Sequence, residues 1–234
     1  MKLKEFLLDT LFQPHCKTCA TPLTGPAKRY TICASCLDAI QIETTLCCVI
    51  CRARLADDTR VCHSSAPLRL AAVGRYSDER LRSLVTRIKY RRHTSAMSAL
   101  AVLIDRYLGN LSFDFTNYHV IPIPLHVERE RKRGFNQSML IAEIIAERLH
   151  LPLLKNELIK TKSTPPQAKT ENLKERVKNL SGCFTVLQPK DVAGKKILLV
   201  DDVCTSGTTL IEAAQTLKQA KARNIIGFVI AKTG

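Results

Sequence analysis

The 234-residue sequence contains no tryptophan, and aromatic residues make up only 5% of it. Proteins that grip single-stranded nucleic acid by base stacking need aromatic side chains, so any nucleic acid bound here is expected to be held through its phosphates, with little sequence preference. Nowhere do about 18 apolar residues run together, which excludes an obvious membrane span. Apart from an echo of CxxC units, there is no internal repeat and no low-complexity tract.

Missing motifs exclude two enzyme classes. P-loop nucleotide hydrolases need GxxxxGK[ST], and the nearest sequence, Gly194-Lys195-Lys196, lacks both the spacing and the hydroxyl residue. No Ser/His/Asp or Cys/His set suggests a catalytic nucleophile. We expect His119, at the start of a predicted strand, and His150, at the end of a predicted helix, to be structural.

The chain has a formal net charge of +15 and a pI near 9.6. Its excess Lys and Arg are spread along the sequence, which favours a polyanion or a phosphorylated ligand as partner; a solvated basic surface explains the charge equally well. Residues 1–12 form an apolar run that Glu5 and Asp9 interrupt, short of a signal peptide core. We therefore expect an amphipathic helix there and a cytoplasmic protein.

Cysteine is concentrated at one end: eight of the ten cysteines lie between Cys16 and Cys62. In a reducing compartment such clustering indicates metal binding rather than disulfides. Two CxxC units, with thirteen residues between them, would bring four thiolates together around a structural Zn²⁺. These four ligands are Cys16, Cys19, Cys33 and Cys36. Residues 1–66 are accordingly predicted to form a small zinc-ribbon module with an N-terminal helix.

A second metal site is less complete. Cys48 and Cys51 form another CxxC unit, and Cys62 is the expected third ligand. The fourth ligand is left open between His63 and Cys47, because adjacent residues rarely bind the same metal; a degraded second ribbon is the alternative. The remaining two cysteines, Cys183 and Cys204, are expected to be small apolar core residues.

Residues 67–234 are predicted to form a second domain in which strands alternate with helices, an α/β fold with a mostly parallel sheet and helices on both faces. Predicted strands cover 71–76, 119–124, 195–200 and 225–231, with an edge strand in 151–160. Predicted helices cover 78–90, 95–108, 137–149 and 210–220. Between them lie a basic loop, 126–137, and a polar excursion, 161–179, interrupted by Pro165-Pro166-Gln167.

The most informative segment is ILLVDDVCTSGTT, residues 197–209. It places Asp201 and Asp202 at the end of an apolar strand and follows them with Thr205, Ser206, Gly207, Thr208 and Thr209. The acids can accept hydrogen bonds from ribose hydroxyls, and the loop and following helix N-terminus can bind a phosphate. An ordinary capping turn needs one hydroxyl, whereas four flank this glycine. Because neighbouring strand residues point to opposite faces, both acids can serve one ribose only if the strand is already turning there.

This segment resembles the signature of type I phosphoribosyltransferases, which bind 5-phosphoribosyl diphosphate (PRPP). Together with the cysteine-rich front, RYSDERLRSLVTRIKYRRH, VIPIPLHVERERKRGFNQS and STPPQ, it resembles the ComF family of competence proteins across nearly the whole chain. The resemblance implies a type I phosphoribosyltransferase-like fold. It also implies that Asp201 and Asp202 bind the ribose hydroxyls of PRPP, and that residues 205–209 bind its 5′-phosphate.

The resemblance further implies a pyrophosphate loop, at which Mg²⁺ would bridge the PRPP oxygens. Leu125 to Arg133 fits this loop, with His126, Arg129, Arg131, Lys132 and Arg133 as its cations. Arg133 is the first choice, and Lys89 at the end of the first helix is the second. The excursion 161–179 would be a hood that closes over the site and excludes water.

The family implies a competence protein that binds PRPP and supports natural transformation in the cytoplasm by handling incoming single-stranded DNA, alongside other competence proteins. The alternative is an active pentosyl-transferring enzyme that moves ribose 5-phosphate to an acceptor without direct DNA binding. The sequence contains no recognisable purine or pyrimidine pocket, so it does not indicate the acceptor.

Overall fold

The computed structural model describes residues 13–55, 62–90, 94–162 and 182–234. The predicted N-terminal helix and most of the predicted hood, with Pro165-Pro166-Gln167, lie outside these residues. Within these ranges, none of the helices combines the length and apolar character that crossing a membrane requires.

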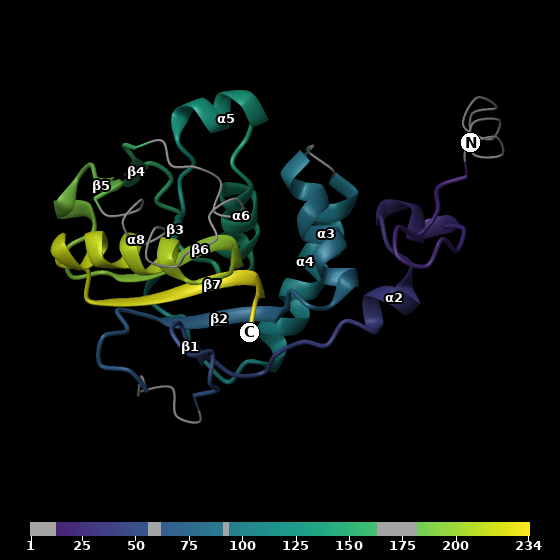
Figure 1. Ribbon diagram of the computed structural model, residues 1–234, viewed down its shortest axis with the longest axis horizontal. Coiled ribbons are helices and arrows are strands. Elements are labelled where there is room, and N and C mark those ends of the chain that lie inside the picture. The colour runs from purple at the N-terminus through teal and green to yellow at the C-terminus, as the bar shows by residue number, and fades with distance from the viewer. Residues whose placement is uncertain (1–12, 56–61, 91–93, 163–181) are drawn as a thin grey trace.

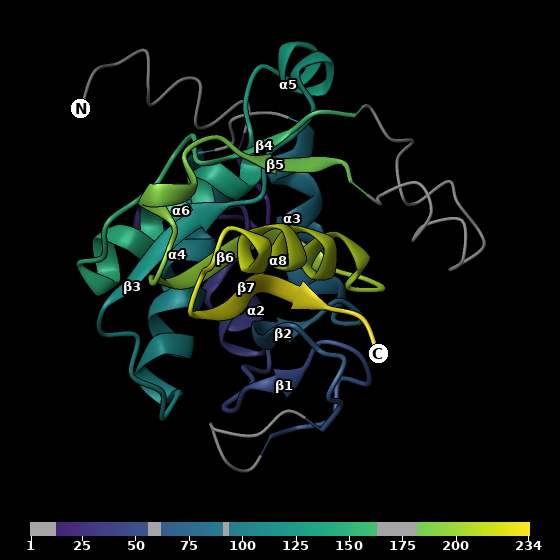
Figure 2. The same ribbon diagram turned by 90° about the vertical axis from the view of Figure 1, so that its left-hand side faces the viewer.

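The core of the molecule is a five-stranded sheet in the order β1-β2-β7-β6-β3 (Figure 2). Its strands are β1 (Cys47–Cys48), β2 (Arg69–Arg75), β7 (Asn224–Lys232), β6 (Lys196–Cys204) and β3 (Tyr118–Pro122). Only β1 is antiparallel to its neighbour; the other pairs are parallel. The predicted α/β fold with a mostly parallel sheet is confirmed.

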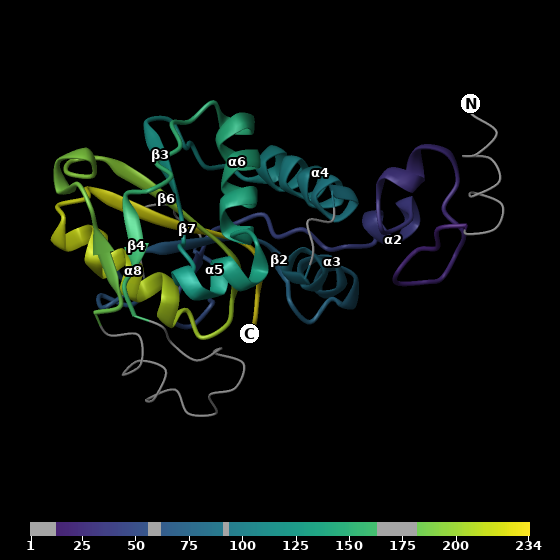
Figure 3. The same cartoon turned by 90° about the horizontal axis from the view of Figure 1, so that it is seen from above.

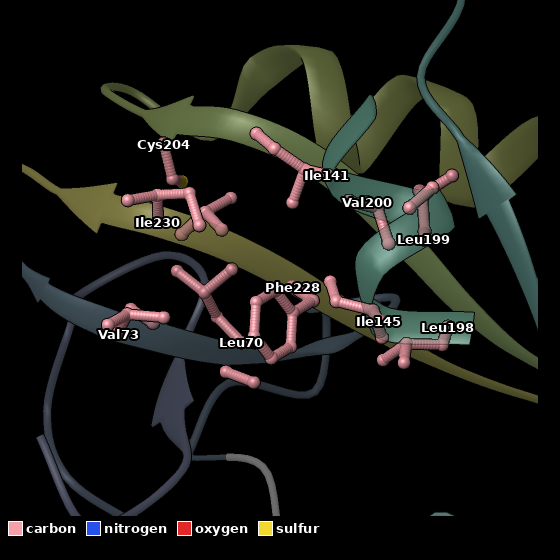
Figure 4. Close-up of a cluster of buried hydrophobic side chains, with 14 of the residues drawn as sticks. Leu70, Val73, Ile141, Ile145, Leu198, Leu199, Val200, Cys204, Phe228 and Ile230 are labelled. Atoms are coloured by element: carbon pink, nitrogen blue, oxygen red, sulfur yellow. The ribbon is translucent and has the colours of Figure 1, made fainter. Parts of the chain in front are cut away.

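The two central strands, β6 and β7, are almost continuously apolar because both of their faces are covered. Gly227 and Phe228, neighbours in β7, point to opposite faces of the sheet. Phe228 packs edge-on against Tyr107, with ring centroids 5.6 Å apart, whereas a side chain at Gly227 would meet Leu210 on the other side. Figure 4 shows Phe228 among the buried side chains of this core.

Helices cover both faces, as predicted. α4 (Thr94–Asn110) and α6 (Gln137–Leu149) pack on one face of the sheet, and α8 (Thr208–Gln219) packs on the other (Figure 3). α3 (Glu79–Tyr90) packs against α4 and reaches β7. The predicted bounds of these four helices agree with the structure to within about two residues, the precision with which helix ends are usually defined.

The prediction of a basic loop at residues 126–137 is wrong, because α5 (Val127–Arg133) is helical. The His126 side chain caps the first turn, and Gly134 ends the helix in the left-handed conformation. Acidic residues in the first turn and basic residues in the last turn complement the helix dipole. The residues at its two ends stabilise α5, which has no buried face. The helix therefore lacks the apolar periodicity by which the sequence could have predicted it.

The predicted edge strand at 151–160 is only partly correct. Leu153 makes a single parallel bridge to Val120 beside β3. The regular part, β4 (Leu158–Lys160), instead pairs antiparallel with β5 (Phe184–Val186) in a separate two-stranded sheet. A short 3-10 turn, η3 (Pro189–Asp191), then leads to β6. The two strands of this small sheet flank the polar excursion on either side.

Where the structure describes the cysteine-rich segment, at residues 13–55 and 62–66, it contains little regular structure: the 3-10 turn η1 (Gly25–Arg29), α2 (Ala34–Asp38) and β1. α2 lies at the end of the molecule far from β4 and β5 (Figure 1). The second half of this segment returns to the sheet, because β1 pairs with β2. The domain boundary at 66/67 stays a prediction.

Candidate functional site

Two loops meet at one edge of the sheet. β3 and β6 are adjacent and parallel, so the segment after β3, which contains α5, and the loop after β6 leave the same edge. Ligands of open parallel sheets bind at the carboxyl ends of the strands. The sequence-predicted residues of both loops therefore lie at the position where this architecture places a ligand.

The strand that carries the acids does not turn at them. β6 continues through Asp201 and Asp202 to Cys204, which still pairs with Lys232 of β7. The expectation that the strand ends at the acids is therefore wrong. By strand alternation, Asp201 lies on the side of Gly227 and α8, and Asp202 on the opposite side.

Asp201 is half-buried and accepts two hydrogen bonds from protein groups. Ser138 Oγ, in the first turn of α6, donates to Asp201 Oδ1 at 2.9 Å, and the Asp202 backbone N–H donates to the same oxygen at 2.8 Å. Burial, and then the charge of Asp202, raise the pKa of Asp201 to about 7.

Asp202 is buried and paired with a cation. Its Oδ2 atom lies 3.2 Å from Lys89 Nζ, at the end of α3. Within the described residues, Oδ2 accepts no hydrogen bond of good geometry besides this ion pair. A buried carboxylate oxygen with spare acceptor capacity suits a ligand hydroxyl.

The loop after β6 combines a left-handed glycine with adjacent hydroxyls. Gly207 has φ 83° and is the N-cap of α8. Ser206 Oγ and Thr208 Oγ1 lie 2.7 Å apart, while Thr205 is exposed and Thr209 is half-buried. The positive end of α8 starts here, so the loop presents backbone amides, hydroxyls and the helix dipole to one anion.

On the opposite loop, Leu125 and His126 are half-buried at the start of α5. Arg133 Nη1 donates to Gln137 Oε1 at 2.5 Å, and Arg131 and Lys132 are exposed. Burial, and then the charge of Arg133, lower the pKa of Arg129. Because the charge of one guanidinium group disfavours that of the other, an anion beside them would stabilise both.

Sequence reasoning missed two polar residues that interact with Asp201. Ser138 hydrogen-bonds to its carboxylate, and Lys160 of β4 is close enough for the charge of Asp201 to influence its pKa, which burial lowers overall. Ser138 belongs to the quoted segment RGFNQS, so it could have been singled out. Lys160 carried no motif, because only the folding of β4 brings it to the site.

The first cysteine cluster has the geometry of a zinc site. The sulfur atoms of Cys16, Cys19, Cys33 and Cys36 lie within 4.8 Å of one another. A tetrahedral zinc ion with its usual Zn–S bond places sulfur atoms roughly 3.8 Å apart, and the Cys19 and Cys33 sulfurs lie 3.6 Å apart. Hydrogen bonds from Thr21 lower the pKa of Cys19 to about 6, which favours the thiolate form that binds metal.

The second cluster is also complete, and its fourth member is His63. Cys48, Cys51, Cys62 and His63 offer ligand atoms within 4.8 Å of one another. The Cys51 and Cys62 sulfurs lie 3.3 Å apart, and His63 Nδ1 lies 3.5 Å from the Cys48 sulfur. Cys47 instead donates to the Leu70 carbonyl oxygen. Both clusters therefore fit zinc.

Comparisons with known proteins identify relatives of the part of the chain that contains these residues. The phosphoribosyl transferase domain family matches residues 136–233, which contain Ser138, both acids and the phosphate loop. Competence protein ComFC of Bacillus subtilis is 31% identical over 57% of this chain and 55% of its own length. DNA utilization protein YhgH of Escherichia coli K12 is 28% identical over 93% of this chain and 96% of its own length. Competence protein F of Haemophilus influenzae is 33% identical over 45% of this chain and 46% of its own length. This chain thus spans about half the length of the two competence proteins.

Proposed function

The chain belongs to the ComF/YhgH family and carries a phosphoribosyltransferase domain, and from this premise we propose that it binds PRPP with Mg²⁺ at the edge where β3 and β6 end. The observation that carries the proposal is that Asp201 lines one small cavity together with Thr205, Gly207 and Thr209. The adjacent Asp202 is buried and pairs with the half-buried Lys89. This arrangement sets an acceptor for sugar hydroxyls next to a built anion site.

The charges of the site support a ligand with anionic groups at both ends. Residues 205–209 would hold the 5′-phosphate, and Asp202 would accept from a ribose hydroxyl. Arg129 and Arg133 would neutralise the pyrophosphate. The bound pyrophosphate would in turn relieve the repulsion between the two guanidinium groups. Asp201, with its raised pKa, would be ionised more fully by a nearby divalent cation. Mg²⁺ would supply charge neutralisation on the pyrophosphate oxygens.

Calorimetric titration of the whole protein with PRPP and Mg²⁺ tests this proposal. Asp202→Asn removes the negative charge of the acceptor, and we expect a loss of affinity of about 10-fold to 100-fold, the usual range for a hydrogen bond to a charged group. The matched control is Asp105→Asn, since Asp105 pairs with Arg148 on the surface, outside the site. Wild-type protein that produces no binding heat would overturn the proposal.

We further propose that the protein handles single-stranded DNA in natural transformation, with other competence proteins in the cytoplasm. Two observations support this role: the printed names of the relatives, which are competence and DNA utilization proteins, and a groove between α3 and the first cysteine cluster. Basic side chains in that groove are Lys17, Arg82 and Arg87. The same helix, α3, carries Lys89, which pairs with Asp202 at the candidate PRPP site.

Salt dependence of binding to a short oligonucleotide tests the DNA role. Each phosphate neutralised contributes a log–log slope of about −0.7 for single strands. Replacing Lys17 and Arg87 with Glu should reduce the slope by about 1.4 if each contacts one phosphate. Lys155→Glu changes charge at an exposed pair with Glu143, outside the groove, and should leave the slope nearly unchanged. A flat salt response of the wild type would exclude the basic groove as a DNA site.

A further inference from the structure

The loop of residues 205–209 is braced from behind by the cysteine-rich segment. Arg52 Nη2 donates to the Thr205 carbonyl oxygen at 2.6 Å, across 153 residues of sequence. A side-chain Cβ at Gly207 would lie 3.0 Å from the Val49 carbonyl oxygen and 3.2 Å from Arg52 Nη2. The turn around residues 49–52 therefore packs directly on the loop that is proposed to bind phosphate.

This contact fixes the direction of a backbone amide. The Thr205 carbonyl accepts from Arg52 and also from Thr233 Oγ1, at 3.1 Å. The carbonyl oxygen of Thr205 and the amide hydrogen of Ser206 belong to one planar trans peptide, in which they point in opposite directions. Holding the carbonyl from behind therefore aims the Ser206 N–H away from Arg52, toward the open side of the loop.

The position of Arg52 depends in turn on the second cysteine cluster. Arg52 follows the ligand Cys51 directly and has a left-handed backbone, with φ 63°. Its N–H donates to the Cys48 carbonyl at 2.9 Å, and the Ile50 N–H points to the Cys48 sulfur at 3.4 Å. A left-handed backbone is uncommon for a residue other than glycine and costs free energy, which the surrounding structure must offset. A metal bound to Cys48 and Cys51 would enforce it.

We propose that Zn²⁺ at Cys48, Cys51, Cys62 and His63 preorganises the loop of residues 205–209 through Arg52, so that affinity for a phosphorylated ligand depends on this metal. Arg52 acts as a positioning residue that never needs to touch the ligand. The proposal rests on the proposed function only in taking PRPP as the ligand. Within the described residues, the first cluster forms no hydrogen bond or ion pair with the loop, so a metal bound there would lack this coupling.

Two matched pairs of variants test the coupling, with zinc content and PRPP affinity measured on each protein. Arg52→Ala should weaken PRPP binding about 10-fold, the effect expected for losing a hydrogen bond from a charged group. Arg54→Ala, two residues later, removes an exposed guanidinium that faces Glu43, and should leave affinity unchanged. Cys51→Ser should lose one equivalent of zinc and weaken PRPP binding. Cys19→Ser should lose the other equivalent and retain affinity.

Hydrogen exchange of the Ser206 and Gly207 amides separates this proposal from the PRPP assignment, because it needs no ligand. We expect faster exchange in Arg52→Ala and Cys51→Ser than in the two controls, with unchanged exchange in β7. If wild-type protein binds no PRPP but this pattern is found, the PRPP assignment fails and the metal coupling stands. If loop exchange in Cys51→Ser and Arg52→Ala equals that of wild type, the coupling is refuted, whatever PRPP does.

Discussion

Asp201 and Asp202 are chemically identical neighbours whose environments make them different groups. Lys89 compensates the charge of Asp202 directly, at 3.2 Å. Asp201 receives neutral donors, from Ser138 and a backbone amide, which compensate a buried charge less completely. The pKa of Asp201 therefore rises to about 7, first through burial and then through the charge of Asp202. Asp202 is held in an ion pair with Lys89, whereas the pKa of Asp201 is raised toward neutrality.

The raised pKa of Asp201 predicts a specific dependence of stability on pH. Between the ordinary value of 3.8 and about 7, the folded protein keeps a proton that the unfolded chain has lost, so this group lowers the free energy of unfolding as pH rises through that window. Asp201→Asn removes the titration. We expect the stability of the variant relative to wild type to increase between pH 5 and pH 8, on the order of 2–3 kcal/mol.

Urea denaturation at several pH values measures this difference. Asp105→Asn is the control, because Asp105 lies at the surface beside Arg148 and lacks the surroundings of Asp201. Parallel stability curves for wild type and Asp201→Asn across pH 5 to 8 would show that Asp201 titrates normally. A difference that decreases with rising pH would reverse the sign of the argument.

At the scale of elements, the sequence predicted the helices and strands that have a clear local pattern of apolar residues. The helix predicted at residues 137–149 is observed as α6, and the strand predicted at residues 225–231 is observed as β7, with one residue more at each end. α5 was missed because its seven residues bury nothing, so no apolar period marks it. Its capping His126 and terminal Gly134 were signals, but short helices with such ends resemble ordinary turns.

The end of β6 shows the opposite limit. Two acids are poor strand residues, and their presence suggested that the strand stops there. β7 extends far enough to pair with β6 through Cys204, and this pairing carries the strand past the acids. The contact of Arg52 with the loop was equally inaccessible, because Arg52 lies 153 residues from Thr205. Ser138 lies in a segment that the sequence does mark, but its contact with Asp201, 63 residues away, could not be read from that segment. Only the register of the sheet and the packing of the helices bring them together.

At the scale of the whole molecule, one buried acid joins the cysteine-rich segment to the sheet. Glu43 is 6% exposed and lies 3.5 Å from Lys232, which is 5% exposed, at the end of β7. It also pairs with Arg75 at 3.1 Å, at the end of β2, and its N–H donates to the Val73 carbonyl. Burial opposes ionisation, but the charges of Lys232 and Arg75 outweigh it and lower the pKa of Glu43.

From the buried ion pairs of Glu43 we predict that the attachment of the cysteine-rich segment to the sheet is a major source of stability. Glu43→Ala leaves Lys232 buried without its carboxylate, and breaking a buried ion pair in this way usually costs about 3–5 kcal/mol. We expect a loss in this range by urea denaturation at neutral pH. Asp38→Ala removes an exposed partner of Arg106 in the same segment and should cost less than about 1 kcal/mol.

Because the pKa of Glu43 is lowered in the folded protein, its contribution should be present above pH 4.5 and disappear at more acidic pH, where the two variants and wild type should converge. Equal losses for Glu43→Ala and Asp38→Ala at neutral pH would mean that the segment is attached chiefly by β1 and the turn around Arg52, and not by this buried charge.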